Sequence, residues 1–305
     1  MPSIGFIYYF KKYKVDILHN NSSNIFIPSF AAQICQIKII YHIREVWNTR
    51  NKLSKVIYYY ISRASSKIIC ITNTVKQGNF SKKDLKKFDN KFVIVTDCIE
   101  IEKFHHIINT KSKEEVIVSF VGRIAPIKGL DILLKALSSL NFPDSGFKLK
   151  LQVIGDIPKE NRFYKSYKKY ILELAAKCQV NTNLEIQFYG FRNDVANLLK
   201  QSHVLVLPSR IEEGLGLVLA EGLICENFLI TSNLGGQKEI IAALGCGLLF
   251  ENDNHIDLAA KVEYYLSNSS MCNSEIPNGK QSALTLFSPQ TYSHLILAIY
   301  SKLAC

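Results

Sequence analysis

Short apolar runs alternate along this chain with longer segments whose apolar residues recur at helical spacing. A run that is apolar on both faces is typical of a strand in a parallel sheet, and amphipathic segments are typical of helices that cover such a sheet. In the first third, the pattern predicts strands at 15–19, 37–42, 67–71 and 91–95, and helices at 25–35, 50–65 and 73–80. This alternation indicates an α/β fold with a parallel sheet.

The same alternation resumes after a loop rich in Glu and Lys at 100–115. It predicts strands at 116–121, 149–154, 184–189, 204–207, 228–231 and 247–250, and helices at 130–140, 163–177, 193–201, 237–243 and 256–266. Residues 267–280 are polar and predict a loop. The 305 residues suffice for two such domains. We expect a first domain at 1–113, a second at 114–288, and a closing helix at 289–305.

Two carboxylates flank a glycine turn after the strand predicted at 204–207. Glu213 precedes Gly214-Leu215-Gly216, and Glu221 lies about five residues into the following helix, roughly 7 Å along its axis. Glycines let backbone approach a ligand closely, and the free N–H groups of a helix start favour an anion. Carboxylates suit sugar or ribose hydroxyls better than phosphate. The two acids are therefore expected to hold the ends of one extended ligand, with a phosphate between them, although each alone could be a solvated helix-end charge.

Two cations follow the strand predicted at 116–121. Gly122 and Arg123 come directly after the strand, and Lys128 stands five residues beyond Arg123. Ligands of open α/β sheets bind at the carboxyl ends of strands. A guanidinium and an ammonium in such a loop suit a diphosphate, and the alternative is a pair of solvated surface cations.

The motifs Glu213-x7-Glu221 and Gly122-Arg123-x4-Lys128-Gly129 together resemble glycosyltransferase family 4. The resemblance implies the GT-B fold, with two Rossmann-like domains whose parallel sheets face a cleft, and sugar transfer from a nucleotide sugar with retention. It implies that Glu213 holds the donor sugar, that Glu221 holds the ribose, and that segment 214–217, including Leu215 and Leu217, holds the diphosphate with Arg123 and Lys128. By the same resemblance, His42 contacts the donor sugar and the backbone at Phe191 meets the base. A lone His at a strand end can equally be structural.

A metal ion is not expected in this chemistry. Metal-dependent sugar transferases usually carry an Asp-x-Asp pair, and no two aspartates of this chain stand two apart. Another positive charge must then stabilise the leaving group. Arg123, Lys128 and the helix that begins near Gly216 could do so, and no cofactor is predicted besides the nucleotide-sugar substrate.

The net charge of +11 lies in the first part of the chain. Residues 1–113 hold 19 Lys and Arg against 7 Asp and Glu, while the rest is nearly neutral. Such an excess favours phosphate-rich partners, and segment 50–67, with three successive tyrosines, suits an anionic membrane surface. The alternative is a solvated, lysine-rich surface. Aromatic and basic residues are not interleaved, so a nucleic acid is not expected.

Eight scattered cysteines without a Cys-x-x-Cys pair favour a reducing, cytoplasmic setting, with peripheral attachment to the inner face of the membrane as one extension.

The first predicted domain is shorter than the resemblance implies. The chain enters at what corresponds to the fourth strand, so about three strands are expected to be missing from this domain. Two alternatives follow: a truncated sugar-nucleotide-binding remnant without activity, or one half of a split transferase. An epimerase on the same fold is a weaker alternative. The expected acceptor is a growing polysaccharide or a lipid-linked glycan.

Overall fold

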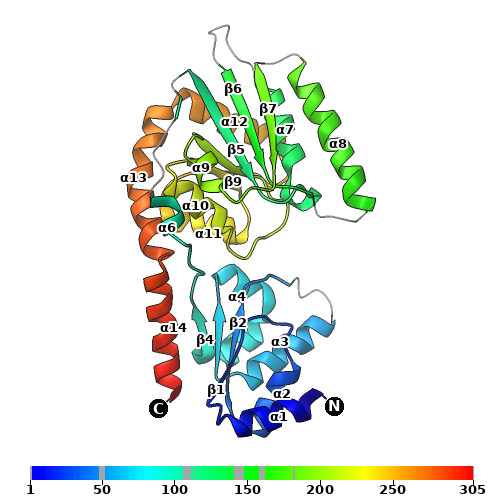
Figure 1. The fold of residues 1–305 in the computed structure, drawn as a ribbon, viewed down its shortest axis with the longest axis vertical. Coiled ribbons are helices and arrows are strands. Elements are labelled where there is room, and N and C mark those ends of the chain that lie inside the picture. The colour runs from blue at the N-terminus through cyan, green and yellow to red at the C-terminus, as the bar shows by residue number, and fades with distance from the viewer. Residues whose placement is uncertain are drawn as a thin grey trace. The chain divides into compact units, whose positions relative to one another are not determined.

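The computed structural model describes residues 2–47, 52–105, 111–112, 114–140, 148–157, 162–180 and 183–304. The chain forms two compact units, each built on one parallel sheet (Figure 1). Unit 1 comprises Met1–Cys98, Glu213–Leu215 and Pro289–Cys305, and unit 2 comprises Ile99–Glu212 and Gly216–Ser288. The division thus falls after Cys98, and the closing helix belongs to unit 1.

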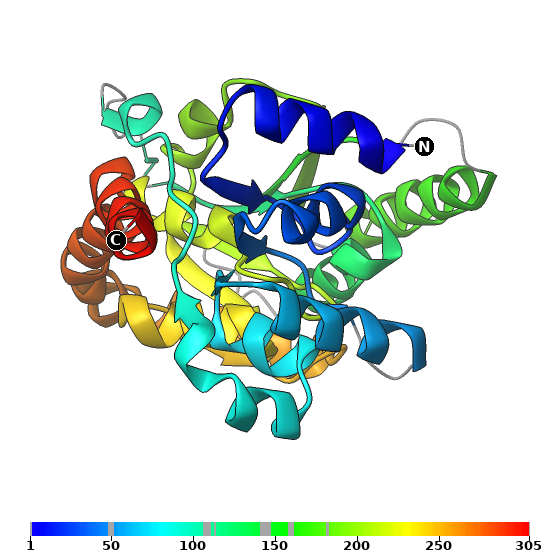
Figure 2. The same cartoon turned by 90° about the horizontal axis from the view of Figure 1, so that it is seen from below.

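Unit 1 has a four-stranded sheet in the order β1-β2-β3-β4. Its elements are α1 (Pro2–Lys12), β1 (Ile17–Asn20), α2 (Ile27–Ile34), β2 (Lys38–Ile43), α3 (Lys52–Ala64), β3 (Lys67–Cys70), α4 (Asn73–Asn79), α5 (Lys82–Lys87), the 3-10 helix η1 (Asp89–Lys91), β4 (Phe92–Ile94) and α14 (Pro289–Ala304). Helices α1 and α2 lie side by side (dark blue, Figure 2). The central strands β2 and β3 are almost wholly buried, as their β-branched, apolar sequences lead us to expect.

The closing helix α14 completes the core of unit 1. Ile296 and Ile299 on α14 pack with Ile40 of β2 and Ile69 of β3, together with Val95 just after β4. The last helix of the chain therefore covers a face of the first sheet.

Unit 2 has a six-stranded sheet in the order β10-β9-β8-β5-β6-β7. Its elements are α6 (Glu102–His105), β5 (Glu115–Val121), the 3-10 helix η2 (Pro126–Lys128), α7 (Leu130–Ser138), β6 (Lys148–Ile154), α8 (Arg162–Gln179), β7 (Leu184–Gly190), α9 (Val195–Leu199), β8 (Val204–Leu207), α10 (Leu217–Ile224), β9 (Phe228–Ser232), α11 (Gly235–Leu244), β10 (Leu248–Phe250), α12 (His255–Ser267) and α13 (Ser269–Leu286). Helix α7 packs against α8 and α12, whereas α10 packs against α9, α11 and α13, so helices cover both faces of the sheet. The chain reverses direction across the sheet between β5 and β8, which is the switch point of a doubly wound fold.

The prediction of a loop at 267–280 is wrong, because residues 269–280 lie in the 18-residue helix α13, and Ser267 ends α12. Its buried stripe is Cys272, Ile276, Gly279 and Ala283, which has helical spacing but consists mostly of small side chains. Gly279 packs so closely that an added Cβ would lie 2.8 Å from Cys246 Cβ. Pro277 and the many polar residues hid this stripe from the hydrophobic pattern.

Candidate functional site

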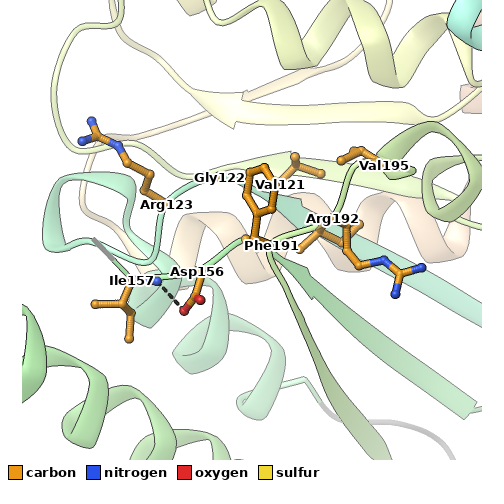
Figure 3. A pocket seen from close by; sticks show the side chains of 10 residues that line it. Val121, Gly122, Arg123, Asp156, Ile157, Phe191, Arg192 and Val195 are labelled. Atoms are coloured by element: carbon orange, nitrogen blue, oxygen red, sulfur yellow. Dashed lines mark hydrogen bonds between the residues drawn. The ribbon is translucent and has the colours of Figure 1, made fainter. Parts of the chain in front are cut away.

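A cavity of about 440 Å³ opens at the carboxyl ends of three neighbouring strands of unit 2 (Figure 3). It is lined by Val121, Gly122, Arg123, Ile154, Gly155, Asp156, Ile157, Phe191, Arg192 and Val195. Most of these residues follow β5, β6 or β7, whereas Val121 and Ile154 end β5 and β6, and Val195 begins α9. Open α/β sheets bind their ligands at this edge, beside the switch point.

Backbone hydrogen bonds join the three strand ends into the floor of the cavity. Gly155 N donates to Gly190 O at 2.8 Å, Gly122 N donates to Ile154 O at 3.0 Å, and Ile124 N donates to Asp156 O at 3.0 Å. Gly155 has φ +137, and an added Cβ would lie 2.0 Å from Gly122 O. Only glycine allows this approach, so the sequence Gly155-Asp156 fixes the shape of the floor.

Two arginines among the described residues line this cavity, and they differ in their partners. Phe191 is 75% exposed, and its ring stands between Arg123 and Arg192 in the view of Figure 3. Arg192 is paired with Asp194 at 2.7 Å. Among the described residues, Arg123 is exposed and has no carboxylate partner. The cavity therefore combines an exposed aromatic face with a guanidinium that can bind an anion.

Lys128 lies on the same loop as Arg123 but does not line the cavity. It ends η2, where its N–H donates to Ala125 O at 2.9 Å, and its side chain is half-buried. The structure thus brings Gly122, Arg123 and Phe191 together in one cavity and places Lys128 further along the β5–α7 loop.

The loop after β8 is divided between the two units. Gly216, with φ +73, is the N-cap of α10 in unit 2, and no side chain caps the N–H groups of Leu217 and the residues after it. Glu221 is the fifth residue of α10 and is half-buried. Burial raises the pKa of its carboxyl, and Lys103 partly offsets this effect.

The three residues before Gly216 belong to unit 1. There Thr72 Oγ1 donates to Gly214 O at 2.9 Å, while Leu215 is buried and Glu213 half-buried. The predicted Glu213-x7-Glu221 motif therefore has one acid in each unit.

Arg210 is a positioning residue that the sequence did not reveal. Its guanidinium donates to both carboxylate oxygens of Asp131 at 2.8 and 2.7 Å and to Pro126 O at 2.8 Å, while its backbone N–H donates to Ile127 O at 2.9 Å. Its Nε donates to Asp253 at 2.7 Å. Arg210 thus ties the loop after β8 to the loop after β5, across the switch point.

The partner acid Asp131 is buried in the first turn of α7. Burial favours a raised pKa of its carboxyl, but hydrogen bonds from Arg210 and from Tyr167, at 2.8 Å, outweigh burial and the pKa is lowered. The hydrogen bonds to Asp131 and Asp253 raise the pKa of Arg210. Arg210 follows a predicted strand and Asp131 lies in the first turn of a predicted helix, yet their pairing depends on the strand order, which the hydrophobic pattern does not state.

The predicted catalytic His42 lies in unit 1, at the carboxyl end of β2, and its side chain is fully buried. Its Nε2 is 3.9 Å from Asp97 Oδ1 and makes no hydrogen bond within the described part of the chain. Arg44, whose Nη2 is 3.5 Å from His42 Nδ1, binds Asp97 at 2.8 Å. Burial, Arg44 and His19 together lower the pKa of His42 to about 3, so the imidazole is neutral at pH 7.

Across the described ranges, no three His, Cys, Asp or Glu residues gather closely enough to bind a metal ion. No described helix combines the length and the hydropathy that crossing a bilayer requires.

Comparison with known proteins identifies a family whose model matches the part of the chain that carries this cavity. Residues 101–282 match the family model described as glycosyl transferases group 1. The chain is 29% identical over 226 residues to an uncharacterized glycosyltransferase of Methanocaldococcus jannaschii, which covers 73% of this chain and 56% of that protein. It is 26% identical over 300 residues to the UDP-Gal:alpha-D-GlcNAc-diphosphoundecaprenol alpha-1,3-galactosyltransferase of Escherichia coli, which covers 88% of this chain and 72% of that protein. The chain thus spans little more than half the length of the first of these relatives.

Two solved structures resemble the chain over nearly its full length. A glycosyltransferase from Rickettsia africae superposes with a TM-score of 0.81 at 22% identity, over 99% of this chain and 80% of that one. HepE of Anabaena, in complex with UDP and glucose, superposes with a TM-score of 0.77 at 16% identity, over 98% of this chain and 80% of that one. These likenesses confirm the predicted α/β fold of the GT-B class.

Proposed function

Because the chain belongs to the glycosyl transferases group 1 family, we propose that it moves a sugar from a nucleotide sugar to a glycan or lipid-linked acceptor, with retention and without a metal ion. The observation that carries this proposal is the cavity at the carboxyl ends of β5, β6 and β7, where Arg123 is exposed and unpaired among the described residues. Such a cavity can take a flat base and the phosphates that follow it.

Within unit 2, the proposed donor site has three parts. The base lies against Phe191 and the backbone around it, and the diphosphate lies against Arg123, Lys128 and the free N–H groups at the start of α10. Glu221 accepts hydrogen bonds from the ribose hydroxyls. Burial raises the pKa of this carboxyl, and Lys103 partly offsets the effect.

The chemical step breaks the bond between the sugar carbon and the diphosphate oxygen. Negative charge then collects on the leaving diphosphate, and preorganised donors stabilise that charge without reorganising. Arg123, Lys128 and the amides of segment 214–217 supply those donors in this proposal, which needs no metal ion. Family resemblance adds front-face attack by the acceptor hydroxyl, whose proton passes to the leaving phosphate.

Unit 1 contributes Glu213 and His42 to the proposal. Glu213 holds the hydroxyls of the donor sugar. His42 is fully buried and neutral, so we do not assign it proton transfer. Its proposed role is to position Arg44, the adjacent and partly exposed cation. UDP sugars are the first donors to test, because the Escherichia coli relative is named for UDP-Gal and the Anabaena structure contains UDP.

The test is release of UDP from a panel of UDP sugars, with and without lipid-linked acceptors. Glu213→Gln should lower turnover about a hundredfold, while Glu212→Gln, which changes the neighbouring exposed carboxylate, should leave it unchanged. Equal turnover in the two variants would refute the assignment of Glu213. Nucleotide binding without any turnover would instead favour the alternative of a non-catalytic binder or half of a split transferase.

Two further expectations remain proposals. The first is attachment to an anionic membrane through the basic residues of the first 113 positions. The second is a cytoplasmic location, on the inner face of that membrane. Co-sedimentation with anionic but not neutral vesicles, lost at high salt, is the measurement that checks this attachment.

A further inference from the structure

The first three helices of unit 1 expose large apolar side chains to solvent. Among the described residues, ten of these exposed side chains lie on α1, α2 and α3. They are Ile4, Phe6, Tyr8, Tyr9, Ile27, Phe30, Ile34, Leu53, Val56 and Tyr59. No residue of the proposed donor site lies on these helices, so that site does not account for their exposed apolar surface.

The three helices lie together on one face of the first sheet. Tyr41 of β2 is 2.7 Å, hydroxyl to hydroxyl, from Ser29 of α2, whereas the preceding Ile40 packs with α14. Successive residues of a strand point to opposite faces, so α2 lies on the face opposite to α14. Tyr60 Oη of α3 donates to Gln33 Oε1 of α2 at 3.0 Å, and α1 packs against α2 (Figure 2). Helix α2 thus contacts both of its neighbours.

The exposed apolar residues repeat at helical spacing. Ile27, Phe30 and Ile34 follow one side of α2, whose other side is already buried, and Leu53 and Val56 follow one side of α3. A surface helix of a globular protein normally carries polar residues on its outer side. Helices that are apolar on the outer side as well form a contiguous exposed patch, and such a patch marks an interaction site.

The charged side chains on these helices all have the same sign. The described residues of α1, α2 and α3 include no Asp or Glu. Their exposed basic residues are Lys11, Lys12, Lys52, Lys55 and Arg63. Lys12 Nζ lies 5.7 Å from the ring centre of Tyr8, so its carbon chain follows the apolar surface while its charge stays in water. The patch therefore combines apolar area with positive charge.

This combination fits an anionic bilayer better than another macromolecule. Helices that lie in a membrane interface bury apolar side chains among the lipid chains and place Lys and Arg against the phosphates. The aliphatic side chains at 4, 27, 34, 53 and 56 offer no plane on which a nucleic-acid base could stack. A second copy of the chain would bring like charges together.

We propose that the outer surface of α1, α2 and α3 inserts its apolar side chains into the interface of an anionic phospholipid bilayer, with the lysines against the headgroup phosphates. This inference rests on the membrane attachment proposed above and deepens it, because it names the surface and adds insertion to charge attraction. It does not depend on the donor site.

The first test compares an apolar variant with a charge variant in co-sedimentation with vesicles of phosphatidylcholine and phosphatidylglycerol. Ile34→Ser should weaken binding about tenfold and leave its salt dependence unchanged, because it removes apolar area alone. Lys12→Gln should weaken binding about fivefold at low salt and make the salt dependence less steep. Ile256→Ser on α12 of unit 2 is the matched control, since Ile256 is 70% exposed and Ile34 is 66% exposed. The control should bind as the unsubstituted chain does.

The second test measures insertion itself. The chain has a single tryptophan, Trp47, so Tyr8→Trp combined with Trp47→Phe gives one fluorescent reporter on α1. Brominated phosphatidylcholine in the anionic vesicles should quench this reporter. Tyr264→Trp in the same background places the reporter on α12 of unit 2, where the quenching should be absent.

Calorimetric titration with UDP keeps this proposal separate from that of the donor site. Binding to anionic vesicles with the expected variant effects supports the membrane surface even where UDP does not bind. Binding of UDP without binding to vesicles would overturn the membrane surface and leave the donor site standing. Equal vesicle affinity in Ile34→Ser and Ile256→Ser, or an unquenched reporter at position 8, would overturn insertion. The proposal would equally fail if Ile34→Ser abolished a dimer or RNA binding and left vesicle binding unchanged.

Discussion

Arg44 and Arg123 both follow a central strand of a parallel sheet, one in each unit, yet their surroundings differ. In unit 1, Arg44 is held by Asp97 at 2.8 Å, beside the fully buried His42. In unit 2, Arg123 is exposed, lines a cavity and has no carboxylate partner in the described part of the chain. At the same position in the fold, the arginine of unit 1 is therefore paired with a carboxylate of the chain, whereas the arginine of unit 2 can bind an anion from solution.

The difference shows where charge can act on a ligand. An arginine that already has a carboxylate partner positions its neighbours, as Arg44 and Arg210 do. An arginine beside a cavity with no such partner can give its charge to a ligand, as we propose for Arg123. Variants that remove a paired or an unpaired arginine, or that disturb its surroundings, test this distinction.

The largest expected effect follows from removing a paired arginine. Arg210→Ala leaves Asp131 buried without its main partner and separates the loops after β5 and β8. Loss of one partner of a buried pair should lower the free energy of unfolding by about 4 kcal/mol, as measured by urea denaturation. Asp253→Asn removes only an exposed contact and should cost less than about 1 kcal/mol. Equal costs in the two variants would contradict the bridging role of Arg210.

A somewhat smaller effect is expected at the floor of the open cavity. Gly155→Ala places a Cβ 2.0 Å from Gly122 O at a positive φ, so the strand ends must separate, at a cost of about 3 kcal/mol. The matched control is Gly190→Ala, which also has a positive φ but has no atom within 4 Å of the added Cβ. It should cost only about 1 kcal/mol by thermal denaturation. A cost for Gly155→Ala no larger than that of the control would show that the floor is not tightly packed.

The closed cluster of unit 1 should respond to pH. The pKa of His42 is about 3 in the folded chain against about 6.5 when unfolded, so the unfolded chain binds the extra proton between these values. Stability is then fully present above about pH 6.5 and falls by about 2 kcal/mol between pH 7 and pH 5. His19, whose pKa burial also lowers, acts in the same direction.

Urea titrations of unit 1 unfolding at several pH values measure this slope. His42→Gln removes the titrating group and should flatten the slope, leaving the part that His19 contributes. An unchanged slope in this variant would mean that His42 has the same pKa in the folded and the unfolded chain, and so would contradict its burial in a neutral form.

The hydrophobic pattern was sufficient for every strand of both sheets, because each strand carries β-branched or other apolar residues. The strands β2, β3, β8 and β9 are almost wholly buried, whereas β1, β4 and β7 are only partly buried. The pattern failed at α13, whose buried stripe includes Cys272, Gly279 and Ala283, since small side chains carry little hydrophobic signal. The pattern also did not predict α1. Several aromatic residues of this helix are exposed, so its apolar positions do not form one buried stripe.

The candidate site was predictable only in part. A strand end with glycine and charge pointed to Gly122 and Arg123, and the family resemblance pointed to Phe191; the three residues line one cavity. Asp156 and the pair Arg210–Asp131 were missed, because a sequence shows which residues follow strands but not which strands are neighbours. The burial of His42 was missed for the same reason, since Tyr292, which stacks on it, comes from the far end of the chain.

The central claim is that Arg123 gives its unpaired charge to the diphosphate of a nucleotide, and calorimetric titration with UDP tests it most directly. Arg123→Ala should weaken UDP binding at least about tenfold while leaving the free energy of unfolding unchanged, because loss of a charge-assisted contact removes that much affinity. Arg192→Ala, the control in the same cavity, loses an arginine already paired with Asp194 and should bind UDP nearly as well as the unsubstituted chain. Equal UDP affinity in the unsubstituted chain and in Arg123→Ala would contradict the account.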